Sequence, residues 1–230
     1  MNHLHRLLAL CRGQSAIIAP WLEERELRWL LTCALTIVLG CGLYGGVVGL
    51  WRAPEQALFT AVKMPLLIFL TCAGNALLNG MLAQVLGSGL GFRQSSLAIL
   101  MSFTIAALIL AALSPIAYFV LVNAPALASA ERGTGHSITL LTDVLFIAYA
   151  GIVANRRLLG LLTTVCVTPS AARRVFWCWL AGNLFLGAQL SWVLRPFIGS
   201  PALAVQFLRD DPLRGNFYTA VFNALRNLIF

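Results

Sequence analysis

Residues 96–122 read SLAILMSFTIAALILAALSPIAYFVLV and contain no charged side chain. A helix of about 20 apolar residues is long enough to cross the roughly 30 Å hydrocarbon core of a bilayer. Similar runs recur through the 230 residues, which are 60% hydrophobic and only 10% charged, with a mean hydropathy of +0.85. Because soluble domains are usually about a quarter charged, the sequence predicts an all-α, polytopic membrane helical bundle.

Five apolar runs predict about five transmembrane helices. The second run is long, and Lys63 and Pro65 in its first third favour an interfacial approach, with the crossing itself starting near Met64. The fourth run is expected to stop at the Asn-Arg-Arg sequence of residues 155–157, before a further apolar stretch. The expected crossings lie within residues 29–50, 57–86, 96–122, 137–153 and 175–193.

The two ends of the chain are more polar than its middle. Residues 1–28 and 196–230 predict interfacial amphipathic segments on either side of a five-helix transmembrane domain at 29–195. Residues 216–230 are too short and too polar for a sixth crossing, so the tail is expected to lie along the outer membrane surface. Its apolar side chains recur at helical spacing on one face, namely Phe217, Val221, Leu225 and Leu228.

The formal net charge of +8 is distributed as in a membrane protein. Lys and Arg residues collect at the ends of the apolar runs, where they contact headgroups and determine topology. With Lys63 left out, nine lie on the side of the N-terminus and six on the other side. We therefore expect a multi-pass protein of the cell membrane with a cytoplasmic N-terminus. No basic face with interleaved aromatic residues occurs, so no nucleic-acid partner is expected.

Motifs that carry catalysis are missing from the sequence. HExxH, GxSxG, P-loop and GxGxxG patterns do not occur in a usable form, and the three histidines form no cluster. The six cysteines occur singly, without the CxxC or Cys/His spacing of a metal site. We therefore expect no catalytic residue, no metal and no cofactor, and an intramembrane enzyme is the third functional hypothesis.

Two ionisable side chains inside apolar runs are the main candidates for function, because charge is expensive in a bilayer. If their helices start where the runs start, Lys63 and Asp143 both lie roughly 9 Å deep and are able to pair. Arg195, at the outer end of the fifth run, is a second possible partner for Asp143. Plainer interpretations stay open: the two charges lie at the interface with Lys63 reaching outward, and Arg195 anchors the chain beside Trp192.

Four amide side chains lie deeper in the runs, and two of them share one helical face. Asn75 and Asn79 are one turn apart. Interhelical hydrogen bonds in membranes average about 0.6 kcal/mol, and we expect the amides to hold helices together. The alternative is that they line a polar pathway. The four are Asn75, Asn79, Asn183 and Gln189.

The first run is rich in glycine. Because glycine has no Cβ, a neighbouring backbone can approach closely, which matters in lipid since no hydrophobic force drives helices together. We expect these glycines to form a packing seam against another helix, within the chain or in a partner. They are Gly40, Gly42, Gly45, Gly46 and Gly49.

Residues 89–120 read GLGFRQSSLAILMSFTIAALILAALSPIAYFV, in which a short glycine-containing loop and a Phe-x-Gln turn open the third run. Together with the long fourth segment and the basic turn at 156–157, this pattern resembles the bacterial members of the Yip1 domain family over roughly residues 30–195. The resemblance implies a five-helix membrane protein whose eukaryotic relatives bind trafficking GTPases and shape membranes. The Asp-Leu-Tyr-Gly-Pro motif of those relatives is absent, and no functional residue is carried over.

A chain made of crossings and short loops favours a scaffold or accessory subunit that packs in the lipid bilayer with other membrane proteins or with itself. The second hypothesis is a small channel or transporter that uses Lys63, Asp143 and the amides. The two differ in the arrangement of their deep polar residues. A pathway needs these residues to converge on one hydrated cavity, whereas a scaffold leaves them in separate helix contacts.

Overall fold

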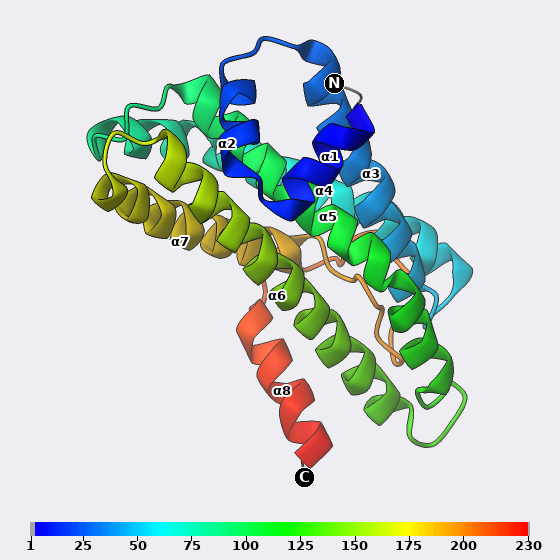
Figure 1. Cartoon of the computed structure of the whole chain (residues 1–230). Helices are drawn as coiled ribbons and strands as arrows, with labels where there is room; N and C mark the ends of the chain where they lie inside the picture. Colours follow the sequence, from blue (N-terminus) through cyan, green and yellow to red (C-terminus); the bar gives the residue numbers. More distant parts are fainter. Residues whose placement is uncertain (1–2, 230) are drawn as a thin grey trace.

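The computed structural model describes residues 3–229, which form a bundle of long helices (Figure 1). No strand occurs within those residues. Helices suit lipid because they satisfy every backbone polar group within one segment. The elements are α1 (His3–Arg12), α2 (Ser15–Ile18), η1 (Ala19–Leu22), α3 (Leu27–Gly49), α4 (Pro54–Val85), α5 (Phe92–Asn123), α6 (Arg132–Val165), α7 (Pro169–Val193) and α8 (Phe217–Ile229).

The five long helices run alternately up and down and form a closed ring (Figure 1). α3 packs against α4 and α5, α7 packs against α4 and α6, and α6 packs against α5, while α4 and α5 also touch across the middle. At one end of the ring the backbone N–H of Val167 donates to Ser88 O at 3.1 Å. At the other end Trp51 Nε1 donates to Pro125 O at 3.4 Å. The turns between helices therefore gather at two opposite ends of the bundle.

Four of these helices, α3, α4, α5 and α6, are long and apolar enough to cross a membrane. The prediction of an all-helical membrane protein is confirmed at that level. α7 has 25 residues but includes Asn183, Gln189 and two arginines, and it is not among the four. Large apolar side chains such as Leu39 and Leu145 stay 63% and 67% exposed, as expected where lipid surrounds a bundle.

Two helices continue past the limits expected for their crossings, because charged residues interrupt hydropathy without interrupting a helical backbone. α6 is one helix that continues through residues 155–157, where Arg156 and Arg157 are exposed and Asn155 Nδ2 donates to Gly151 O at 2.8 Å within the helix. α4 is likewise one helix from its first residue, with Pro65 inside it. No break in the helix precedes Met64, and the start of the crossing itself stays a prediction.

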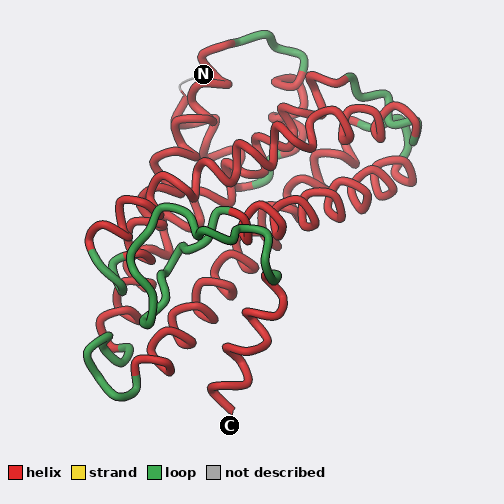
Figure 2. Tube along the Cα trace, turned by 180° about the vertical axis from the view of Figure 1, so that it is seen from behind, coloured by secondary structure: helices red, strands yellow, loops and turns green. Residues whose placement is uncertain are grey.

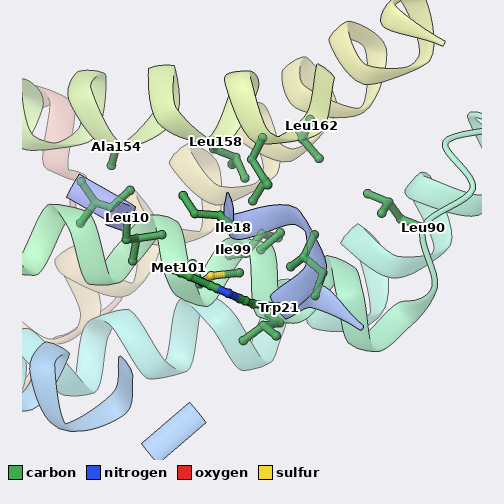
Figure 3. Close-up of a cluster of buried hydrophobic side chains, with 14 of the residues drawn as sticks. Leu10, Ile18, Trp21, Leu90, Ile99, Met101, Ala154, Leu158 and Leu162 are labelled. Carbon is green, nitrogen blue, oxygen red and sulfur yellow. The ribbon is translucent and has the colours of Figure 1, made fainter. Parts of the chain in front are cut away.

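The N-terminal segment packs onto one end of the bundle, which we call the N-terminal face. Figure 3 shows Leu10, Ile18 and Trp21 beside Met101 of α5 and Leu158 of α6. All five side chains are buried. Part of the apolar side of this predicted interfacial segment is therefore covered by protein, whereas Leu4, Leu8 and Ile17 stay exposed.

Two arginines hold the N-terminal segment in place. The Arg93 guanidinium, at the start of α5, donates to the backbone oxygens of Leu22, Glu23 and Glu24 at 2.7 to 2.9 Å. Arg6 forms ion pairs with Glu24 and Glu26 at 3.1 and 2.6 Å, the only two ion pairs within residues 3–229. The chain entering α3 is thus tied to both α1 and α5.

The opposite end of the bundle is crossed by an irregular segment, residues 194–216, which we call the tail cap (Figure 2). α8 follows it and packs mainly against α6. On α8, Ala224 is buried and Phe217 and Val221 are half-buried, whereas Leu225 is 47% exposed. The predicted apolar face is therefore only partly the packed face, and the side chain of Leu228 lies outside the described part.

Three glycines of α3 lie against the backbones of neighbouring helices. A Cβ on Gly45 would lie 2.6 Å from Thr60 O of α4, and one on Gly49 would lie 2.6 Å from Gln56 O. A Cβ on Gly40 would lie 2.6 Å from Ala107 O of α5. The predicted seam is thus present within the chain, and it faces two helices. Gly42 and Gly46 lie farther from α4, with hypothetical Cβ contacts of 3.4 and 3.8 Å.

This spacing predicts opposite outcomes for two adjacent glycines. Gly45→Ala should lower the free energy of unfolding by about 1–3 kcal/mol, the usual cost of overpacking, because the new methyl group meets a backbone oxygen. Gly46→Ala is the matched control and should behave like the wild type. Thermal unfolding in detergent, followed by the monodisperse fraction on size exclusion, measures both. Equal melting temperatures for the two variants would contradict the seam.

Candidate functional site

Lys63 belongs to a buried polar stripe on α4 together with Gln56 and Thr60. The three residues are spaced by four and three positions, so they share one helix face, and each is 0% exposed. Gln56 Nε2 donates to the carbonyl oxygens of Pro196 and Phe197 at 2.8 and 2.9 Å, and Lys63 Nζ donates to Pro196 O at 2.8 Å. Thr60 Oγ1 also bonds to Phe197 O. The stripe therefore binds the first residues of the tail cap.

The tail cap surrounds the Lys63 ammonium with aromatic rings and backbone oxygens. Nζ lies 4.8 Å from the centroid of the Phe207 ring and 5.9 Å from that of Phe197. Such cation–π contacts favour a desolvated ammonium. Arg52 uses the cap in the same way, because its Nη2 donates to Leu203 O at 3.0 Å. Both cations thus bind backbone oxygens of the tail cap.

Arg195 also bonds to backbone oxygens and forms no ion pair with Asp143. Its guanidinium lies 4.0 Å from the centroid of the Trp192 ring, as in the interpretation of an anchor beside that tryptophan. Burial lowers the pKa of Arg195 and the nearby Asp211 carboxylate partly offsets this, but a guanidinium stays charged. Its acceptors, at 2.6 to 3.0 Å, are the carbonyl oxygens of Trp192, Asp211, Pro212 and Arg214.

Asp143 of α6 has a neutral partner. The Tyr44 hydroxyl of α3 donates to Asp143 Oδ1 at 2.7 Å. Tyr44 is 0% exposed, whereas Asp143 is half-buried. The pair joins α3 and α6, which do not pack directly against each other. The long tyrosine side chain spans the distance between the two backbones. No other hydrogen bond to the carboxylate occurs within the described residues.

The predicted pair of Lys63 and Asp143 is wrong. The two charges lie at a similar level of the bundle, because Gly45, next to Tyr44 on α3, contacts Met64, next to Lys63 on α4. They lie on α4 and α6, however, which are not neighbours in the ring. Each charge is therefore desolvated against uncharged groups.

The amide residues form a separate contact between α4 and α7. Asn75 Nδ2 donates to Asn183 Oδ1 at 2.9 Å, and Asn79 Nδ2 donates to the same oxygen at 3.4 Å. Trp179 Nε1 adds a bond to the backbone oxygen of Asn79 at 2.8 Å. Three of the four amides thus hold helices together as expected. The side chain of Gln189 is exposed and forms no hydrogen bond with the described residues.

A shallow hollow beside Asp143 does not connect these groups. It is lined by residues of α3, α5 and α6 and has room for about one water molecule. Neither Lys63 nor any of the amides lines it. Within residues 3–229 no three His, Cys, Asp or Glu side chains come together as metal ligands. The polar side chains can hydrogen-bond and fix helices, and they are arranged in three separate places.

We find no family model, curated protein or solved structure that matches this chain. The similarity to the Yip1 domain family therefore stays a prediction. Any functional argument has to come from the contacts themselves.

Sequence reasoning missed the partners of the charged residues. Tyr44 gave no signal, because a tyrosine in an apolar run is usually part of the core. Gln56 and Thr60 did carry one: with Lys63 they repeat at helical spacing on one face, which marks a polar stripe. The stripe donates to backbone oxygens of the tail cap. Backbone acceptors cannot be predicted from a pattern of side chains in the sequence.

Double-mutant cycles should separate the real pair from the predicted one. Lys63→Met and Asp143→Leu should have additive effects on the free energy of unfolding, within about 0.5 kcal/mol, because the residues do not touch. Tyr44→Phe and Asp143→Leu form the matched cycle and should couple by about 0.5–2 kcal/mol. Reversible unfolding in mixed micelles gives both coupling energies. A coupling of Lys63 to Asp143 as large as that of Tyr44 would refute the arrangement.

Proposed function

We propose that this chain is an integral membrane scaffold or accessory subunit that packs with partner membrane proteins and has no catalytic site of its own. The observation that carries the proposal is the separation of the deep polar groups. Lys63 binds the tail cap, Asp143 binds α3, and the amides join α4 to α7. Each group is used for internal cohesion at a different place, as a scaffold requires.

The same separation counts against the alternative, a small channel or transporter. A pathway needs polar side chains from several helices around one hydrated space, and here the hollow beside Asp143 is lined by neither Lys63 nor the amides. An intramembrane enzyme, the third candidate, would need convergent chemical groups in a pocket. A scaffold needs neither a hydrated pathway nor a catalytic pocket.

We also propose five crossings, with α7 as the fifth, in the cell membrane and with the N-terminus in the cytoplasm. α7 is antiparallel to α6 and closes the ring with α4 (Figure 1). The Lys and Arg count supports the orientation. With this orientation, the tail cap and α8 lie on the outer side, and α8 lies at the membrane interface. The Yip1-like pattern supports the same layout.

Side-specific labelling tests the fifth crossing. In a background without the six native cysteines, Ala130→Cys and Ala204→Cys should react with an impermeant maleimide from outside the cell, and Ser170→Cys should not. All three positions are exposed, and only a membrane-spanning α7 puts Ser170 and Ala204 on opposite sides. Reaction of Ser170 and Ala204 from the same side would leave four crossings.

The functional proposal predicts a defined assembly. Extracted from its native membrane in polymer nanodiscs, the chain should occur with another membrane protein, or with further copies of itself, in a fixed ratio that native mass spectrometry can count. Reconstituted alone in liposomes, it should add no flux of protons, Na⁺ or K⁺ above that of empty vesicles. A monomeric particle together with an ion flux that Asp143→Asn abolishes would favour a channel or transporter over a scaffold.

A further inference from the structure

Asp143 is the one acidic side chain in the interior of the four apolar helices, because Glu55 lies in the first turn of α4. Its carboxylate receives one hydrogen bond, from Tyr44, and one oxygen has no partner among the described residues. The ion pairs in this part of the chain are both at Arg6, at the other end of the bundle. An ionisable group in such a position is expensive and suggests a partner.

The surroundings of this carboxylate limit what that partner is. The hollow beside it lies between α3 and α6 over α5, with Tyr44 and Val48 on one wall, Thr139 and Thr142 on the other, and Ala117 at the base. The hollow has room for about one water molecule, which is also the size of an ammonium group. A planar guanidinium suits bidentate binding of a carboxylate, and here Tyr44 already occupies one of the two oxygens.

We propose that the gap between α3 and α6 docks a transmembrane helix of another protein, whose lysine places its ammonium group in the hollow against Asp143. This inference rests on the scaffold function and names the chemistry of one partner. The lysine stem is long and flexible enough to run along apolar surface from a neighbouring helix into the gap. An ammonium group there would donate a charge-assisted hydrogen bond to the free carboxylate oxygen.

A second copy of this chain does not supply that lysine. Lys63 is the only lysine in the sequence, and it is 0% exposed beneath the tail cap. The arginines of the four apolar helices lie in the first turns of these helices, or at positions 156 and 157 in the half of α6 away from the tail cap. The partner is therefore a different membrane protein with a lysine in the third of its helix on the tail-cap side.

Synthetic peptides test the charge requirement without the natural partner. Three labelled leucine-rich helices of about 20 residues carry lysine, arginine or leucine six positions from one end, and energy transfer to the wild-type protein in liposomes measures binding. The lysine peptide should bind about tenfold more tightly than the leucine peptide, and the arginine peptide should gain much less. Asp143→Asn, which keeps the shape and an acceptor for Tyr44, should abolish the preference for lysine.

Glu55→Gln is the matched control, because it removes a carboxylate at the same end of the bundle that is exposed and lies outside the hollow. It should keep the lysine preference. Equal binding of the lysine and leucine peptides to the wild type, as expected if the hollow holds only water or a small cation, would overturn the inference. So would a preference that survives Asp143→Asn.

Nanodisc extraction separates this inference from the proposed function. If Asp143→Asn leaves the native assembly intact and the peptides show no preference, the chain is a scaffold and the lysine inference is wrong. If the wild type forms no assembly, the scaffold function is wrong, whatever the peptides show. Loss of the assembly in Asp143→Asn, but not in Glu55→Gln, supports both.

Discussion

The close approach of α3 to its neighbours determines the rest of the bundle. Gly45 and Gly49 place the α3 backbone against carbonyl oxygens of α4, and Gly40 places it against α5. With these contacts on two sides, α3 cannot rotate about its axis without a steric clash. Tyr44, one position from the seam, is then directed toward α6, where it meets Asp143. The same packing leaves the polar stripe of α4 turned toward the tail cap.

The charged groups illustrate how a membrane bundle accommodates polarity without ion pairs. Lys63 is stabilised by a backbone oxygen and two aromatic rings, and Asp143 by one phenol. Neither arrangement neutralises its charge. Lys63 is fully enclosed, so its task is internal and consists of holding the tail cap. Asp143 is only half-buried beside a hollow, which makes it the more informative residue about partners.

The two ends of the chain act as parts of the bundle. The N-terminal segment contributes Leu10, Ile18 and Trp21 to the core between α5 and α6 (Figure 3). The tail cap supplies the acceptors for α4 and crosses the opposite end (Figure 2). A scaffold gains from such ends, because they fix the helices to one another and leave the outer helix faces free for lipid and partners.

The sequence by itself determined that the chain is a helical membrane protein and that glycines line one face of α3, because composition, run length and residue size act locally. It also indicated helix contacts by Asn75, Asn79 and Asn183, since amides in lipid need partners. It did not show that α6 continues through residues 155–157, where hydropathy falls but the helical backbone is unbroken. Only the tertiary structure decided which charges meet. Lys63 and Asp143 lie at a similar depth, but their helices α4 and α6 are not neighbours in the ring. The order of helices around the ring is not encoded in any single run.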